Sequence, residues 1–155
     1  MNFEEFTEAL AKYAPEKILF VGLGNELRGD DAAGLIMLDR FRQRPAYRTS
    51  HFINAGSNPE NYLQKILNAD ADLIVFIDAA RFSAVPGTIA VLDSEKILES
   101  NFSTHAFSIK LVEQFLRQQK EYDFVYIGIE PNSTGLGHEL SLPIRESIDR
   151  FFNGD

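Results

Sequence analysis

The sequence predicts an α/β fold. We expect a three-layer sandwich whose five-stranded, mostly parallel, twisted sheet contains one antiparallel strand and has helices on both faces. Short apolar runs, most of them ended by glycine or an acidic residue, alternate with segments in which apolar residues recur every three or four positions. One further apolar run follows its predecessor too closely for a helical crossover. These patterns indicate alternating strands and helices, with one strand reversed.

The individual elements follow from these patterns in chain order. The expected strands are residues 18–21, 51–55, 73–77, 88–92 and 123–128. The expected helices are residues 3–13, 35–41, 58–68, 103–116 and about 143–152. In the fourth, the apolar residues Ile109, Val112, Phe115 and Leu116 are expected on one face. Residues 73–77 form the most continuous apolar run, so we expect them to be the central strand. Pro86 and Gly87 mark a turn into residues 88–92, which we expect to be antiparallel or at an edge.

Composition limits the classes of protein to consider. The 155 residues are expected to form one domain, residues 1–155, with 45% hydrophobic and 25% charged residues. A net charge of −8 argues against a nucleic-acid surface and suits a basic peptide or a metal cation. The absence of cysteine excludes disulfides, thiolate nucleophiles and cysteine-ligated zinc. With no signal-peptide pattern and no run near the roughly 18 apolar residues that span a bilayer, we expect a cytoplasmic location without membrane insertion. The sequence does not give the oligomeric state, for which a monomer is the expectation.

Three polar residues fall where the predicted topology delivers side chains to one edge of the sheet. Asp31 follows the first strand, Asp78 ends the third, and His105 opens a helix. Right-handed crossovers place the loops that follow parallel strands on one side of the sheet, so these side chains are expected to meet. Two carboxylates and one imidazole suit a divalent metal such as nickel or zinc, with coordination positions left open. The sequence therefore predicts a metal site at Asp31, Asp78 and His105.

The position of His105 gives it a further reason to act as a ligand. With Thr104 as N-cap, His105 is expected in the first helical turn, where the helix dipole disfavours the imidazolium. A neutral imidazole is what a metal requires. The alternative, a capping or surface histidine, is less favoured because two aspartates are expected beside it. Asp78 ends a run of five apolar residues, where it needs water, a donor or a metal.

The remaining polar residues near this edge have simpler explanations. We expect either Asp30 or Asp31 to stabilise the first turn of the helix that follows. A proton-sharing pair is not expected, because sequence neighbours point apart on a strand or helix. Glu130 ends the fifth strand, where both a contribution to the site and an ordinary turn role stay open. His51 and His138 are expected at the surface.

Two other kinds of site are disfavoured by the motifs. Gly22, Gly24 and Gly34 do not follow the dinucleotide-binding spacing, and a phosphate would have to approach two aspartates with little nearby cation apart from Arg28. The chain lacks a G-x-S-x-G motif, and Ser57 has no obvious base. Nucleotide binding and a serine nucleophile are therefore not expected.

The turn from Gly22 to Gly34 reads G-x-G-N-x-L-x-x-D-D-A-x-G, which resembles the signature of the hydrogenase maturation proteases. The resemblance continues in residues 54–61, 77–80, 103–105 and 128–131. It thus extends over nearly the whole chain from Lys17 to Phe152. Within the family, the proteases that serve formate-hydrogenlyase-type hydrogenases are the most similar.

The resemblance implies an endopeptidase that removes the carboxyl-terminal extension of a nickel-iron hydrogenase large-subunit precursor after nickel insertion. The family's metal-binding positions match Asp31, Asp78 and His105, which are thereby expected to be both catalytic and metal-binding. The nickel is supplied by the precursor and serves as the recognition element, with zinc or cadmium as expected substitutes. No covalent intermediate is expected.

Two alternative functions remain at this point. A nickel-binding or precursor-binding maturation module that does not cleave would use the same three ligands. Peptidyl-tRNA hydrolase also begins with a strand running into Gly-Leu-Gly-Asn, but it needs a histidine and an asparagine soon afterwards and a basic face for tRNA. Here Asp30 and Asp31 follow, and the net charge is −8.

Overall fold

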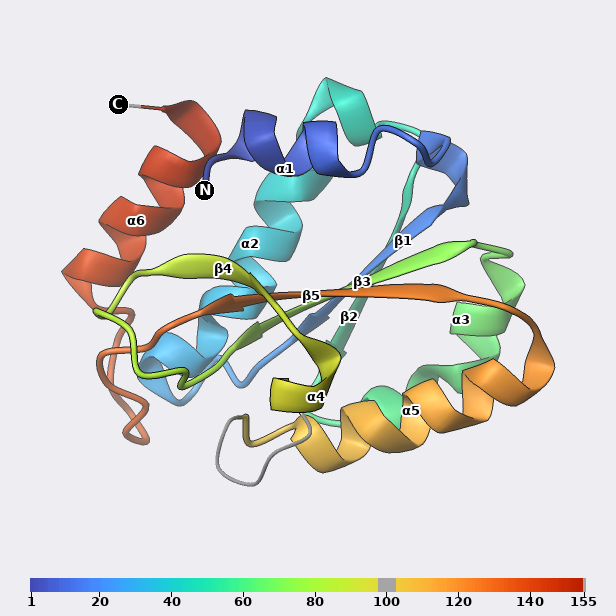
Figure 1. Ribbon diagram of the computed structural model, residues 1–155. Coiled ribbons are helices and arrows are strands. Elements are labelled where there is room, and N and C mark those ends of the chain that lie inside the picture. The colour runs from blue at the N-terminus through green and yellow to red at the C-terminus, as the bar shows by residue number, and fades with distance from the viewer. Residues whose placement is uncertain (98–102, 155) are drawn as a thin grey trace.

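A computed structural model describes residues 1–97 and 103–154, in which helices cover both faces of a five-stranded sheet (Figure 1). The strands are β1 Ile18–Leu23, β2 His51–Gly56, β3 Leu73–Ala79, β4 Ile89–Leu92 and β5 Asp123–Ile129. The α-helices are α1 Phe3–Ala9, α2 Ala33–Arg42, α3 Leu63–Asn68, α4 Ser94–Ile97, α5 Ala106–Gln119 and α6 Leu142–Asn153. The predicted α/β class and layer arrangement are confirmed.

The strand order is β2-β1-β3-β5-β4, so the most continuous apolar run is the central strand, as predicted. β1 pairs in parallel with β2 and β3, and β3 pairs in parallel with β5. β4 is antiparallel to β5 and lies at the edge. This is the reversed strand that the short connection predicted. With four parallel strands, the turns that follow β1 and β3 must open at the same edge of the sheet.

Side chains of β1 alternate between two hydrophobic cores. Ile18 and Phe20 enter the core beneath α1, α2 and α6, whereas Leu19 and Val21 enter the core beneath α3 and α5 (Figure 1). In the first core, the ring of Phe41 in α2 stacks on that of Phe20 at 5.0 Å between centroids. Each such fully buried side chain contributes about 1.5–3 kcal/mol. Burial on both faces explains why β1 and β3 read as continuous apolar runs.

One short helix was not predicted, and two predicted helices differ from the structure in detail. The expected helix over residues 58–68 begins with a 3-10 turn, Pro59–Tyr62, and becomes α-helical only at Leu63. The four-residue α4 was not foreseen, because one turn is too short to show a period. Phe115, expected on the buried face of α5, is 37% exposed. At about 100° per residue it lies on the outer side of the helix, with Phe107 and Leu111.

The longest described helix, α5, has 14 residues. Within residues 1–97 and 103–154, no helix combines the length and the apolar character needed to cross a membrane.

Candidate metal centre

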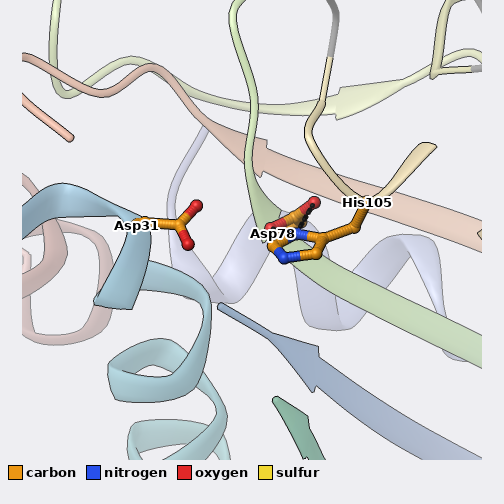
Figure 2. A group of neighbouring side chains, drawn as sticks. All are labelled: Asp31, Asp78 and His105. Carbon is orange, nitrogen blue, oxygen red and sulfur yellow. Dashed lines mark hydrogen bonds and ion pairs between the residues drawn. The ribbon is translucent and has the colours of Figure 1, made fainter. Parts of the chain in front are cut away.

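Asp31, Asp78 and His105 lie together at the carboxyl edge of β1 and β3 (Figure 2). Asp31 belongs to the 3-10 turn Gly29–Ala32 between β1 and α2, Asp78 is the penultimate residue of β3, and His105 immediately precedes α5. All three are buried, and one potential ligand atom from each lies within 4.8 Å of the others. The structure thus brings together all three residues that the sequence singled out.

The donor set fits a divalent cation. Metal bonds of about 2.0–2.2 Å place adjacent ligand atoms about 3 Å apart when they subtend a right angle. His105 Nδ1 lies 3.1 Å from each carboxylate oxygen of Asp78. Asp31 points toward this pair from the opposite side (Figure 2). Small adjustments of these side chains would enclose one ion and leave further coordination positions for a ligand.

One hydroxyl fixes Asp78 relative to His105. Ser103 donates a hydrogen bond to Asp78 Oδ2, and its Oγ accepts the backbone N–H of His105 at 3.0 Å. The neighbouring Thr104 Oγ1 lies only at 3.5 Å from His105 Nδ1. Sequence reasoning had not assigned Ser103 a role. The available signal was a hydroxyl two residues before the candidate ligand, a spacing at which serine commonly bonds to the backbone.

The predicted setting of His105 was wrong. α5 begins at Ala106, so His105 itself is at the N-cap position and Thr104 is not. Burial lowers the pKa of His105, but its hydrogen bond to Asp78 and the charges of Asp78, Asp31 and Glu60 outweigh burial and raise the pKa above its ordinary value. The raised pKa is opposite in direction to the lowering that the helix dipole was expected to cause. A cation bound here competes with the imidazole proton.

Asp31 experiences opposing electrostatic influences. Burial raises its pKa, the charge of His105 lowers it, and the charge of Asp78 raises it again. Weaker lowering contributions come from a backbone hydrogen bond of Asn25 and from the charge of Arg28. The net result is a raised pKa. The Asp31 carboxylate therefore lies in surroundings where an added positive charge is favourable.

Asp30 has a structural role that the sequence did not reveal, since it holds a distant loop by hydrogen bonds. Its carboxylate accepts backbone N–H groups from Asn132 at 2.9 Å, Ser133 at 2.8 Å and Ser141 at 2.7 Å, together with the Ser141 hydroxyl. Burial raises the pKa of Asp30, but these hydrogen bonds outweigh it and lower the pKa below its ordinary value. Neither Asp30 nor Asp31 lies in the first turn of α2 or caps it, so the expected stabilisation of that turn was wrong. Asp30 fastens the loop of residues 132–141 to the turn after β1.

The other polar residues considered from the sequence lie outside the centre. Glu130 Oε1 accepts two backbone N–H groups of residues 82–84, which settles its role as a turn residue. His138 is exposed as expected, and its Nδ1 lies 2.7 Å from Ser133 Oγ. His51 is half-buried in β2, so its expected surface position was only partly right.

Two glycines allow the first turn and α2 to lie against the sheet. A Cβ on Gly34 would lie 2.4 Å from the carbonyl oxygen of Leu23 and 2.6 Å from that of Ile77. Gly24 has a φ of +151°, and its Cβ would lie 2.2 Å from the carbonyl oxygen of Asp31. No larger residue fits at either position without moving backbone. These glycines therefore set the distance between Asp31 and β3, which carries Asp78.

A cleft of about 500 Å³ opens beside the centre. Asp31 and His105 line it, and the rest of its lining includes neutral polar side chains and two arginines, Arg28 and Arg81. The volume lies in the range of pockets that enclose small ligands.

Comparisons with known proteins agree on one family. The family model described as hydrogenase maturation protease matches residues 37–153, which include Asp78 and His105. A curated relative, the hydrogenase 3 maturation protease of Escherichia coli K12, is 26% identical over 132 residues, covering 84% of this chain and 83% of the relative.

Solved structures agree with this family. The crystal structure of the NiFe hydrogenase maturation protease HycI from Thermococcus kodakarensis is 33% identical, with a TM-score of 0.78, and covers 94% of this chain and 92% of its own. The hydrogenase maturating endopeptidase HybD from E. coli is 26% identical, with a TM-score of 0.71 and coverage of 86% and 85%. The chain belongs to the hydrogenase maturation protease family, whose members are peptide hydrolases.

Proposed function

We propose that this protein is an endopeptidase that removes the carboxyl-terminal extension of a nickel-iron hydrogenase large-subunit precursor after nickel insertion. In this proposal the nickel belongs to the substrate and serves as the recognition element. The supporting observation is the buried group of Asp31, Asp78 and His105, with ligand atoms within 4.8 Å of one another beside a cleft of about 500 Å³.

The three side chains would act by completing the coordination of the precursor's nickel. Two carboxylates and one imidazole leave positions for ligands that the precursor contributes, so only a nickel-loaded precursor would be held. Holding the metal would place the scissile bond in the cleft, where orientation lowers the barrier. Nickel is a Lewis acid that polarises a carbonyl or acidifies water. The hydroxyl of Ser103 donates to Asp78 and accepts the backbone N–H of His105, so it would hold these two side chains in place.

The test is to mix the purified protein with nickel-loaded and nickel-free precursor and to follow the released fragment by mass spectrometry. We expect cleavage only of the nickel-loaded form, and loss of cleavage in Asp78→Ala. Asp39→Ala is the matched control, because Asp39 is exposed on α2 and outside the cleft. Equal cleavage of both precursors would refute nickel recognition, and an active Asp78→Ala would refute the site. Cleavage of precursor loaded with zinc or cadmium tests whether these metals can replace nickel in recognition.

A module that binds nickel or precursor without cutting is the remaining alternative. It predicts a stable complex with the nickel-loaded precursor and no released fragment, so the same assay separates the two. The peptidyl-tRNA hydrolase alternative is superseded by the family assignment. A cytoplasmic location and a monomeric state stay predictions.

A further inference from the structure

We propose that Arg28 and Arg81 form a carboxylate-binding subsite beside the metal centre, which takes an acidic group of the peptide segment bound in the cleft. The identity of that peptide rests on the proposed function. The binding of a carboxylate can be measured without it.

The fold places both arginines at one cleft although they are distant in sequence. Arg28 lies in the turn after β1, Arg81 follows β3, and these two strands are neighbours in the sheet. Both side chains are exposed and line the cleft that also contains Asp31 and His105. Two guanidinium groups are therefore presented within one recess, next to the candidate centre.

Neither guanidinium group is committed to a structural partner in the part of the chain that the structure describes. Within residues 1–97 and 103–154, neither arginine side chain forms a hydrogen bond or an ion pair. By contrast, Arg40 Nη1 lies 2.6 Å from Asp149 Oδ1, and Arg117 Nη2 lies 2.8 Å from Glu113 Oε1. In a chain of net charge −8, two uncommitted arginines in one cleft indicate that the cleft accepts an anion.

The charge balance of the site strengthens this inference. A divalent cation held by Asp31 and Asp78 would balance their two carboxylates and leave the charges of Arg28 and Arg81 uncompensated. A guanidinium group presents parallel N–H donors that match a carboxylate. A carboxylate is also the anion that a peptide carries, on an acidic side chain or at its terminus.

The first experiment measures carboxylate binding directly. The Nε–Hε resonances of the arginines are followed by NMR while the protein is titrated with acetyl-Ala-Glu-Ala-amide, acetyl-Ala-Gln-Ala-amide, or acetyl-Ala-Gln-Ala with a free terminal carboxylate. We expect a carboxylate-bearing peptide to shift Arg28 and Arg81, and the fully neutral peptide not to. Whether the side-chain or the terminal carboxylate binds more tightly identifies the source of the acidic group.

Variants distinguish a subsite from a general charge effect. The double variant Arg28→Gln, Arg81→Gln should weaken binding of the acidic peptide about tenfold. Arg48→Gln should not weaken it, because Arg48 is exposed in the loop before β2, outside the cleft. Equal binding of acidic and neutral peptides, or unchanged affinity in the double variant, would overturn the subsite. The subsite would also be overturned if the double variant changed only the affinity for zinc. The arginines would then act on Asp31 and Asp78 and not on the peptide.

A second experiment applies the subsite to the nickel-loaded precursor. Each single variant should raise KM about threefold to tenfold and leave kcat nearly unchanged, because the contact holds substrate and transition state alike. The rise of KM with added salt should be smaller in the double variant. A lower kcat with an unchanged KM would contradict the subsite. If the unaltered protein cuts no precursor, the proposed function fails, and the peptide titration still decides the subsite.

Discussion

Asp30 and Asp31 are adjacent in one 3-10 turn and both are buried, yet their side chains have different surroundings. Asp30 accepts three backbone N–H groups and one hydroxyl, and its pKa is lowered. Asp31 faces Asp78 and His105 across the candidate centre, and its pKa is raised. Burial therefore does not distinguish an acid with a structural role from a candidate metal ligand. The distinction is whether the protein itself fills the acceptor sites of the carboxylate or leaves them for a ligand.

The same substitution at both positions should produce the largest difference. Asp30→Asn should lower the free energy of unfolding by about 3 kcal/mol, because it removes a buried charged acceptor from several donors. Asp31→Asn should change it by less than about 1 kcal/mol, and in the stabilising direction, because it relieves a buried charge. Urea unfolding with comparison of midpoints and slopes measures both. Equal losses in the two variants would contradict the comparison.

The stability gained by binding zinc should depend on Asp31 and not on Asp30. Zinc at about 100 times its Kd should add about 2.7 kcal/mol to the stability of the unaltered protein. Asp31→Asn should lose this increment, and Asp30→Asn should retain it from a lower starting stability. Thermal unfolding with and without zinc provides the measurement. An increment that survives in Asp31→Asn would remove Asp31 from the centre.

Two serine hydroxyls extend the comparison, since Ser103 donates to Asp78 as Ser141 donates to Asp30. Ser103→Ala should weaken zinc affinity about tenfold, about 1.4 kcal/mol, because the ligand loses its orienting partner. Ser103→Thr should restore most of it. Ser141→Ala should leave zinc affinity unchanged and cost about 1 kcal/mol of stability. Calorimetric zinc titration of the three variants decides, and equal effects of the two alanine variants would argue against a positioning role for Ser103.

The two aspartates should also give pH dependences of opposite sign. Asp30, with its lowered pKa, contributes stability that is fully present above its unfolded pKa of about 3.9 and lost as the pH falls through its folded pKa. Asp31, with its raised pKa, costs stability progressively as the pH rises above about 3.9 toward its folded pKa. Relative to the unaltered protein, Asp30→Asn should therefore recover at low pH, and Asp31→Asn should gain as the pH rises. Urea unfolding between about pH 3 and pH 7 tests both signs.

The convergence of the site could be predicted because it follows from topology. Parallel strands open at one edge, so Asp31 after β1 and Asp78 in β3 had to approach each other. The central strand and the reversed edge strand were predictable for similar reasons, since both are visible in run length and connection length. The sequence pattern is sufficient to predict these features because it determines whether successive strands run parallel or antiparallel.

The contacts that the sequence did not reveal depend on tertiary distance. The hydrogen bonds of Asp30 join residues more than 100 positions apart, and nothing near Asp30 indicates a loop at residues 132–141. Phe115 was misplaced because helical spacing alone offered two neighbouring stripes, and the buried one contains Ile109, Val112 and Leu116. The setting of His105 was misjudged because one residue of helix boundary separates a first-turn position from an N-cap position.

The attachment of the 132–141 loop through Asp30 has a thermodynamic consequence. Asp30 and Asp31 are joined by one peptide bond, so a loop displacement that moves the backbone of Asp30 would also move the backbone that carries Asp31 beside the candidate metal centre. A partner that binds the loop would then change the affinity of the candidate centre for an ion, and the ion would change the affinity for the partner by the same factor.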